Sequence, residues 1–299
     1  MAENTVKKIA TRESYGNSLK ELAEEFPNLV VLDADLAAAT KTGIFRKAYP
    51  DRHIDCGIAE SNMMGVAAGL SLVGKIPFVS SFAMFAAGRA FEQVRNSIGY
   101  PHLNVKIGAT HAGITVGEDG ATHQCNEDIA LMRTIPGMVV MCPSDDVEAR
   151  AAVRAALEYE GPVYIRFGRA AVPVINDHPG YHFEIGKGTV VREGKDVTIV
   201  ATGICVDSAL GAAKMLEEEG ISAEVVNICT IKPLDEEIII NSAKKTGKVV
   251  TVEEHSVIGG LGSAVCDCLC ANHPVPVKKV GMQDVFGESG SCLLYTSPS

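Results

Sequence analysis

The chain has 299 residues, of which 46% are hydrophobic and 21% charged, so it is long enough to bury the cores of two domains. A formal net charge of −10 argues against binding to nucleic acid or to an anionic membrane surface. The polar start predicts no signal peptide, and the uncharged apolar runs are shorter than the roughly 18 residues of a membrane span. We therefore expect a cytoplasmic protein with no membrane association.

Short β-branched runs alternate with helical patterns through the first half of the chain. Strands are predicted over 29–35, 76–82, 103–110, 137–143 and 162–168, and helices over 11–26, 59–73, 84–98 and 145–158. Thr11 is the expected N-cap of the first helix. Apolar strands joined by helices are typical of a parallel sheet that is covered on both faces.

The stretch 173–185, which contains the turn-prone "NDHPG", interrupts this alternation and is expected to be a linker. Strands and helices alternate again from "DVTIVATG" to "VPVKKV". The sequence therefore predicts an α/β fold with two doubly wound, mostly parallel-sheet domains, over 1–172 and 186–290. The end of the chain, 291–299, has no helical periodicity and no charged side chain, so we expect a foreign or disordered tail without function.

Nine cysteines in a chain without secretory features are expected to be reduced thiols. Cys266 and Cys270 lie one helical turn apart and His273 follows three residues later, a spacing that could place three metal ligands on one helix face. Neither a CxxC pair nor a second ligand cluster accompanies them. We therefore expect buried thiols on a helix and no metal site.

Glu60 stands at the head of a long uncharged stretch, "ESNMMGVAAGLSLVG", in which no ionisable side chain follows it. Gly65 and Gly69 lie at helical spacing in this stretch, which predicts a buried helix packed closely against a neighbour. The simplest interpretation of Glu60 is a carboxylate in the first turn of that helix, where unpaired N–H groups and the helix dipole favour negative charge.

The strand "LNVKIGAT" is followed by a long polar loop, "HAGITVGEDGATHQ", which contains His111, Asp119 and His123. Parallel sheets bind ligands at the carboxyl ends of their strands, and connections in compact α/β domains are usually about 2–6 residues long. A long ionisable loop at this place indicates a functional site, although a solvated loop would also be polar. Phe82 and Phe85, upstream, could stack on a planar heterocycle or belong to the core.

Four segments together resemble the pyrimidine-binding domain of transketolases, which are thiamine-diphosphate enzymes. These segments are "GIAESNMMGVAAGLSLVG", "PFVSSFAMF", "THAGITVGEDGATHQ" and "IPGMVVMCPSD". Two others, "KPLD" and "VTVEEHSVIGGLGSAV", are similar to the C-terminal domain of the same enzymes. The resemblance extends from Arg12 to about Phe286.

The resemblance implies a role in cofactor binding for four residues. Glu60 would hydrogen-bond a ring nitrogen of the cofactor's aminopyrimidine and so activate the cofactor. Phe82 and Phe85 would form the aminopyrimidine pocket, with Gly88 at a position where the family has a third aromatic ring. Asp35 matches an aspartate that lies near the thiazolium ring.

The same resemblance implies a site for sugar phosphates. His111 and His123 would line the substrate channel, where they would stabilise developing charge or move protons. Asp119 would hydrogen-bond the hydroxyl beside the carbonyl of the ketose. Arg169 and Arg12 match arginines that hold the sugar phosphate, for which a guanidinium is well suited.

Two features of transketolases are absent from the sequence. It contains no GDG motif of the kind that holds the diphosphate and its metal, and Ala39 and Thr40 stand where the family has a phosphate-binding serine. The resemblance therefore implies the C-terminal subunit of a split transketolase, with an N-terminal, diphosphate-binding partner subunit that holds Mg²⁺. We expect a homodimer formed through the helix near Gly65 and Gly69, joined by two partner chains, that transfers two-carbon units between sugar phosphates.

Four other classes of protein share part of this pattern. Deoxyxylulose-phosphate synthase shares several segments but has an arginine where this chain has His111, and the β subunit of 2-oxoacid dehydrogenases lacks the "GEDGATHQ" run. A non-catalytic regulatory subunit would keep the fold without turnover. A dinucleotide-binding oxidoreductase would need GxGxxG, which "GGLGSA" at 259–264 matches only in part.

Overall fold

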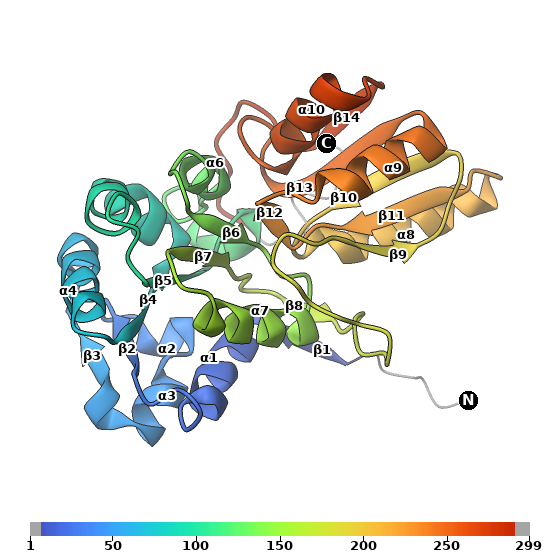
Figure 1. Ribbon diagram of the computed structural model, residues 1–299. Helices are drawn as coiled ribbons and strands as arrows, with labels where there is room; N and C mark the ends of the chain where they lie inside the picture. Colours follow the sequence, from blue (N-terminus) through green and yellow to red (C-terminus); the bar gives the residue numbers. More distant parts are fainter. Residues whose placement is uncertain (1–6, 291–299) are drawn as a thin grey trace, which may run out of the picture.

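The computed structural model of the protein describes residues 7–290, which form two main sheets with helices on both faces of each (Figure 1). The larger sheet has seven strands in the order β12-β6-β7-β5-β4-β2-β3, and all are parallel except β12. Its strands are β2 (Leu29–Asp33), β3 (His53–Asp55), β4 (Ile76–Phe82), β5 (Lys106–Thr110), β6 (Val139–Met141), β7 (Val163–Arg166) and β12 (Thr230–Lys232).

Short and long helices surround this sheet. They are α1 (Thr11–Leu22), α2 (Ala37–Thr40), α3 (Gly43–Ala48), η1 (Pro50–Arg52), α4 (Glu60–Leu72), η2 (Met84–Arg89), α5 (Phe91–Gln93), η3 (Val94–Gly99), η4 (Ile114–Asp119), α6 (Asp128–Arg133) and α7 (Asp146–Glu158). Successive side chains of an apolar strand point to opposite faces. In β2, Val31 therefore packs into the cluster with α1 and α7, and Leu32 into the cluster with α4 and η3.

The smaller sheet has five strands in the order β14-β13-β10-β11-β9, with β9 antiparallel at one edge. Its elements are β9 (Thr189–Arg192), β10 (Val197–Ala201), α8 (Cys205–Glu218), β11 (Ala223–Asn227), α9 (Glu236–Thr246), β13 (Val249–Ser256), α10 (Leu261–Asn272) and β14 (Val277–Met282). The helix α8 packs on one face, and α9 and α10 pack on the other. A separate antiparallel pair joins β1 (Lys8–Ala10) to β8 (Ala171–Pro173).

The predicted α/β class with two mostly parallel sheets is confirmed, but two helix predictions are wrong in detail. Thr11 is the first residue of α1 and Ala10 is its N-cap, because Thr11 Oγ1 instead accepts a hydrogen bond from the Gly168 N–H at 2.9 Å. The segment 84–98 is not one α-helix, since π-type turns η2 and η3 flank the short α5.

The predicted burial of α4 is correct for one face only. Met63 and Ala67 are fully buried, whereas Gly65 and Gly69 are exposed, with no atom close to where a Cβ would stand. The exposed face continues into Leu72, which is 73% exposed. An apolar helix with a free face of small residues therefore lies on the surface of this chain.

The expectation of buried thiols on the last helix is also only partly correct. Cys268 is buried, but Cys266 is half-buried and Cys270 is exposed, because only one face of α10 meets the sheet. All eight cysteines in the described part of the chain are free. No helix within residues 7–290 is long and apolar enough to cross a membrane. The predicted tail, 291–299, lies outside the described residues.

A buried charged cluster joins the two halves of the chain. The Arg166 guanidinium, at the end of β7, lies 2.9 Å from an Asp128 carboxylate oxygen through Nε, and Tyr164 donates a hydrogen bond to the same carboxylate at 2.7 Å. The Nη2 group of Arg166 donates to the backbone carbonyl of Glu254, in β13, at 2.7 Å. All four residues are buried, so the pairing compensates the desolvation of the charges.

Asp128→Asn would remove the nearer of the two carboxylates that face the buried Arg166 guanidinium, and leave only Glu254, whose Oε2 lies 4.0 Å from Nη1. Removing one partner of a buried ion pair costs about 3–5 kcal/mol, so the free energy of unfolding from urea titration should fall by about 3 kcal/mol. The control is Glu218→Gln, on the exposed side of α8, which should change it by less than about 0.5 kcal/mol. Equal stability of the two variants would contradict a structural role for the pair.

Candidate active site

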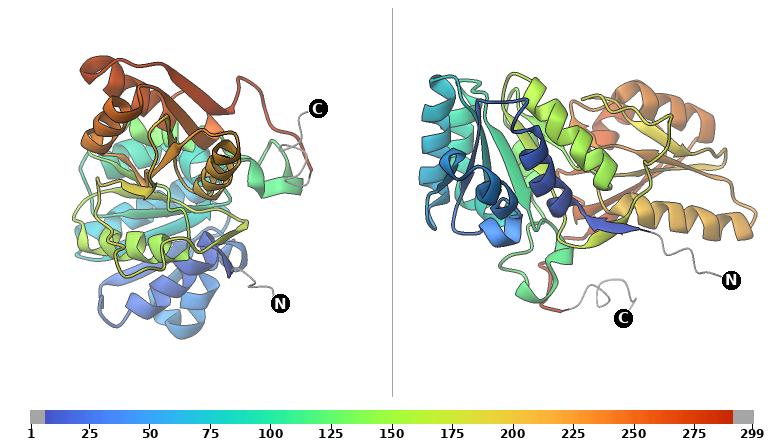
Figure 2. Two further views of the ribbon diagram at one scale, coloured as in Figure 1. Left: turned by 90° about the vertical axis from the view of Figure 1, so that its right-hand side faces the viewer. Right: turned by 90° about the horizontal axis from the view of Figure 1, so that it is seen from below.

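The predicted site residues follow the carboxyl ends of neighbouring strands in the larger sheet. Asp35 lies just beyond β2, Phe82 ends β4, and His111 follows β5. Because β5, β4 and β2 are adjacent and parallel, their ends meet at one edge of the sheet. The substrate loop, defined here as residues 111–124, extends from this edge and is green in Figure 2.

Glu60 is the first residue of α4, and its side chain is only 1% exposed. Its Oε2 lies 2.9 Å from Nη1 of Arg89, whose side chain is 51% exposed. The guanidinium carbon of Arg89 also lies 4.5 Å from the centroid of the Phe85 ring. At this place a flat, nitrogen-containing group therefore stacks on an aromatic ring while it donates a hydrogen bond to Glu60.

Four rings lie together beside this pair. Phe82 and Phe85 stack with centroids 5.9 Å apart, and the His111 ring stacks on Phe82 at 3.9 Å. The ring of His123 meets Phe85 edge-on at 5.4 Å. Phe82 is buried and partly covered by His111, whereas Phe85 is half-buried, so Phe85 presents the accessible ring surface.

His111 is held in a neutral form. Its backbone has φ of 57°, an uncommon conformation for a residue with a side chain, and its Nε2 lies 3.1 Å from Nη1 of Arg12. An arginine can only donate, so Nε2 is the acceptor, and Nδ1 carries the proton toward Thr110 Oγ1 at 2.8 Å. Burial, helped by the positive charges of Arg12 and Arg169, lowers the pKa of His111 to about 3.

Arg12 and Arg169 make a positively charged corner beside His111. Arg12 Nη1 donates to the carbonyl of Ala39 at 2.9 Å, and Arg169 Nη1 donates to the carbonyl of Val116 at 2.7 Å. The Nε of Arg12 is buried and has no partner within residues 7–290. Burial and the neighbouring Arg169 lower the pKa of Arg12. Two close guanidinium groups with an unused donor favour an anion.

Asp35 is presented by a tight turn after β2. The preceding Asp33 is buried and accepts hydrogen bonds from the hydroxyls of Thr40 (2.9 Å) and Thr42 (2.8 Å). The backbone N–H of Asp35, at φ of 61°, donates to the Asp55 carboxylate at 3.1 Å. The side chain of Asp35 is exposed as a result.

The substrate loop carries the other two predicted residues. Asp119 ends the 3₁₀ helix η4 and is exposed, and His123 is half-buried with its Nδ1 2.9 Å from Thr122 Oγ1. A carboxylate of the second half holds the start of the loop, because Glu254 Oε1 accepts a hydrogen bond from the Thr115 N–H at 2.5 Å. The structure thus gathers Glu60, Phe82, Phe85, His111, His123, Arg12 and Arg169, and leaves Asp35 and Asp119 facing solvent.

Sequence reasoning missed Arg89 and Glu254. A signal for Arg89 exists, because it is the only ionisable residue between Lys75 and Glu92, and a lone charge in an apolar segment needs a partner. Glu254 has no comparable signal, since it reaches the loop from 139 positions along the chain.

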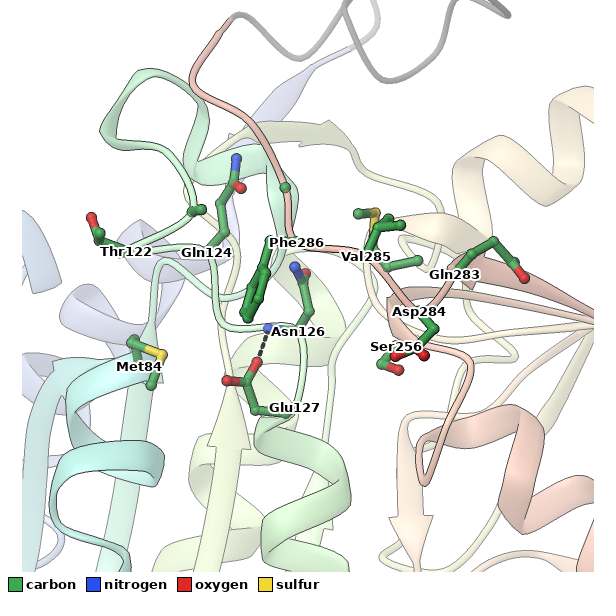
Figure 3. Close-up of a pocket in the computed structure, with 13 residues that line it drawn as sticks. Met84, Thr122, Gln124, Asn126, Glu127, Ser256, Gln283, Asp284, Val285 and Phe286 are labelled. Carbon is green, nitrogen blue, oxygen red and sulfur yellow. Dashed lines mark hydrogen bonds between the residues drawn. The ribbon is translucent and has the colours of Figure 1, made fainter.

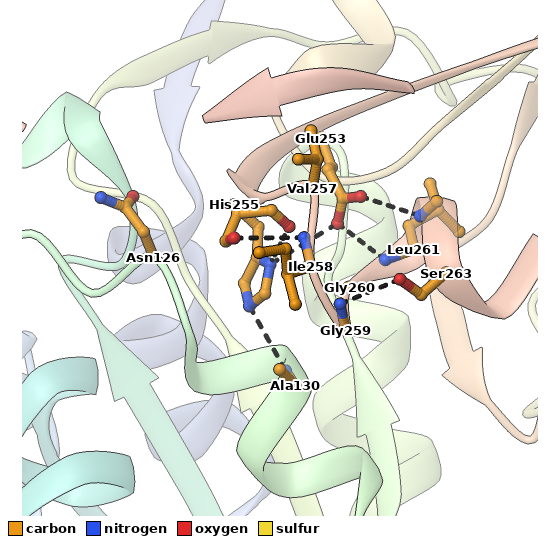
Figure 4. Close-up of polar contacts among 12 residues, drawn as sticks. Asn126, Ala130, Glu253, His255, Val257, Ile258, Gly259, Gly260, Leu261 and Ser263 are labelled. Carbon is orange, nitrogen blue, oxygen red and sulfur yellow. Dashed lines mark hydrogen bonds and ion pairs between the residues drawn. The ribbon is translucent and has the colours of Figure 1, made fainter. Parts of the chain in front are cut away.

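The partial glycine motif at 259–264 does not make a phosphate site. Glu253 accepts hydrogen bonds from the N–H groups of Leu261 (2.7 Å) and Gly262 (2.8 Å) at the start of α10, as Figure 4 shows. The amides that would cradle a dinucleotide phosphate are therefore used by a carboxylate of the chain itself. The oxidoreductase alternative loses its only support. Within residues 7–290, no group of three or more His, Cys, Asp or Glu side chains could hold a metal ion.

A buried carboxylate beside a half-buried aromatic ring, both already in contact with a flat guanidinium, suits the binding of a flat nitrogen-containing group at the edge of this sheet. Comparison with known families defines the class of protein further. The transketolase pyrimidine-binding domain matches residues 7–174, and the transketolase C-terminal domain matches residues 186–296.

Individual relatives agree with this result. The chain is 53% identical over 281 residues to a transketolase C-terminal section of Methanocaldococcus jannaschii, covering 93% of this chain and 88% of the relative. It is 50% identical over 279 residues to the 6-deoxy-6-sulfo-D-fructose transketolase subunit SqwH of Clostridium sp., with 93% and 86% covered. A solved structure titled as a split-gene transketolase, inactive β4 tetramer, is 60% identical with a TM-score of 0.87, covering 93% of this chain and 91% of that one.

The chain therefore belongs to the transketolase family, as a subunit of a split transketolase, and the predicted resemblance is confirmed. The domains of this family imply dependence on thiamine diphosphate.

Because the pKa of His111 is lowered, its imidazole should stay neutral at pH values well below those at which an exposed histidine becomes protonated. The folded pKa lies below the unfolded value of about 6.5, so the unfolded chain binds the proton first, and the fold loses stability as the pH falls from about 6.5 toward 3. Side-chain nitrogen NMR should show the neutral, Nδ1-protonated form from pH 8 to about pH 4. His111→Asn identifies the resonance, and protonation with a midpoint near 6.5 would contradict the geometry.

Proposed function

We propose that this chain supplies the cofactor-activating carboxylate, Glu60, of a two-chain enzyme that transfers a two-carbon ketol unit from a ketose phosphate to an aldose phosphate. The observation that carries the proposal is the guanidinium of Arg89, which stacks on Phe85 and donates to Glu60. The aminopyrimidine of thiamine diphosphate is likewise flat and can present a ring N–H to a carboxylate. The residues present therefore fit the group.

Each residue of the site has a separate task in this proposal. Bound thiamine diphosphate supplies the electron sink for the two-carbon unit. Glu60 exchanges a proton with the ring nitrogen, and Phe85 and Phe82 hold the ring plane. His111 is neutral and both of its ring nitrogens are held, by Arg12 and Thr110, so it lines the site without adding a charge, and His123 stands at the edge of Phe85.

In this proposal, Arg12 and Arg169 bind the anionic end of the substrate. The Nε of Arg12, which has no partner in the described part of the chain, and the proximity of Arg169 support an anion there. Phosphate and sulfonate are both tetrahedral anions, so a sulfonated ketose of the kind named for the Clostridium relative fits the same corner as a sugar phosphate. Asp119, exposed on the substrate loop, would bind the ketose hydroxyl beside the carbonyl, and Asp35 would face the thiazolium ring.

An N-terminal transketolase subunit is the proposed partner, and it would hold the diphosphate and Mg²⁺. The two families matched by this chain describe the pyrimidine-binding and C-terminal domains. The exposed face of α4, with Gly65, Gly69 and Leu72, supports a homodimer core of this chain. The proposed location is the cytoplasm, and the activity is that of the pentose phosphate pathway transferases.

Glu60→Gln tests the catalytic role. The amide keeps the shape of the side chain but cannot exchange the proton, so turnover of the complex with its partner should fall by at least about 10²-fold. The assay follows cleavage of xylulose 5-phosphate and of 6-deoxy-6-sulfofructose in parallel. Glu92→Gln, the same change at an exposed residue of α5, is the matched control and should retain full turnover. Full turnover of Glu60→Gln would remove Glu60 from the mechanism.

The isolated chain should bind thiamine diphosphate only weakly. Ring stacking and one hydrogen bond provide a few kcal/mol of binding free energy before the entropy of association is subtracted. In addition, the cofactor must displace the Arg89 guanidinium, which is paired with the Glu60 carboxylate. Calorimetry should detect no micromolar binding, and light scattering should show a homodimer or a larger assembly. With partner and Mg²⁺, a two-plus-two complex with ketose cleavage is expected. Micromolar binding or turnover by the chain alone would contradict this division, and a complex without turnover would favour a regulatory subunit.

A further inference from the structure

The chain after β14 returns to the substrate loop of the first half. Residues 283–290 leave the smaller sheet and run beside the loop, as both views in Figure 2 show. We define the C-terminal strap as residues 287–290, the part of this segment that contacts the loop. Nothing in the proposed reaction assigns a role to this segment.

Two hydrogen bonds join the strap to the loop. Ser289 Oγ donates to the backbone carbonyl of Glu118 at 2.5 Å, and Nε2 of Gln124 donates to the backbone carbonyl of Glu288 at 3.0 Å. Glu118 directly precedes Asp119, and Gln124 directly follows His123. The strap is therefore bonded on the outer side of both proposed substrate residues, which fixes the two ends of the short segment between them.

Missing side chains make this close approach possible. Gly287 is buried although its neighbours are exposed, and a Cβ on it would stand 1.9 Å from Oε1 of Gln124. A Cβ on Gly120 of the loop would meet the Cβ of Ser289 at 3.1 Å. Gly287 therefore cannot carry a side chain unless the strap or Gln124 moves.

Apolar burial does not hold the strap. The side chain of Phe286, directly before it, is 90% exposed and overhangs a cavity of about 670 Å³ between the two halves of the chain (Figure 3). Among the described residues, the two hydrogen bonds and the glycine contact all connect the strap to the loop. A second contact from the same half, Glu254 to the Thr115 N–H, fixes the start of the loop.

We propose that the C-terminal strap is a positioning element for ketose binding, which acts by fixing Glu118 and Gln124 on either side of Asp119 and His123. It gives the C-terminal domain a part in substrate recognition without any contact to the substrate. The ketose role of Asp119 and His123 rests on the proposed function, whereas the bracing of the loop does not.

The test is Gly287→Ala, which adds one methyl group where Gln124 leaves no room. Gly211→Ala, on the exposed side of α8 with no atom within 4 Å, is the matched control. Hydrogen exchange of the full chain reports on the loop directly. Amides of residues 114–124 should exchange at least about tenfold faster in Gly287→Ala and at the wild-type rate in the control. Unchanged exchange in Gly287→Ala would overturn the bracing, whatever the activity of the protein.

Kinetics of the complex with its partner provide the second readout. In Gly287→Ala, KM for xylulose 5-phosphate should rise about tenfold, equal to about 1.4 kcal/mol, while kcat and the affinity for thiamine diphosphate change little. A fall in kcat alone, or an unchanged KM with a loosened loop, would overturn the positioning role. If the wild-type complex has no turnover, the proposed function fails, and the exchange result still decides whether the strap braces the loop.

Truncation separates the strap from the residues beyond it. A chain that ends at Phe286 should reproduce the faster exchange and the raised KM of Gly287→Ala. A chain that ends at Gly290 keeps both hydrogen bonds and should have slower loop exchange and a lower KM than the chain that ends at Phe286. Identical behaviour of the two truncations would overturn the proposal.

Discussion

One constraint places the candidate site: parallel strands end at the same edge of their sheet. The strands β2, β4 and β5 end at that edge, so Asp35, Phe82 and His111 lie there together although they are far apart in the sequence. Glu60 reaches the same region because α4 begins after β3, the strand beside β2. The packing of the apolar strands thus determines the position of the site residues, and the loops determine the orientation of their side chains.

Two ion pairs of similar length have different physical roles because they differ in exposure. Arg166 is 5% exposed and pairs with an Asp128 that is fully buried. Breaking this pair would leave a desolvated charge without its partner, which is costly. Arg89 is 51% exposed and pairs with the buried Glu60, so its guanidinium can return to water while the carboxylate takes another partner. The first pair fixes the junction between the two halves, and the second is the place where, under the proposed function, the cofactor would replace Arg89.

The sequence predicts features that repeat locally and misses those made by distant segments. Alternating apolar runs and helical spacing were enough for the class of fold, the strand β4 and the helix α4. Thr11 was wrongly predicted to be the N-cap of the first helix, because its hydroxyl instead accepts a hydrogen bond from the N–H of Gly168, 157 positions away. The antiparallel β12 and the Ser289 contact to Glu118 likewise depend on chain segments brought together only by folding. The motif residues could be named in advance, but their hydrogen-bond partners could not.

Under the proposed function, this chain and its partner would bind different parts of the cofactor and the sugar. Under the proposed function, the aminopyrimidine end, the anionic end of the sugar and the loop with Asp119 all belong to this chain, whereas the diphosphate belongs to its partner. A diphosphate is the same for every substrate, so a subunit that binds it needs no change when the sugar changes. Under the same proposal, the contacts that discriminate between sugars would lie at Arg12, Arg169 and the substrate loop, to which the strap is hydrogen-bonded. Two related enzymes could thus differ in the sugar they use through changes in this subunit alone, by altering the loop or the residues that hold it.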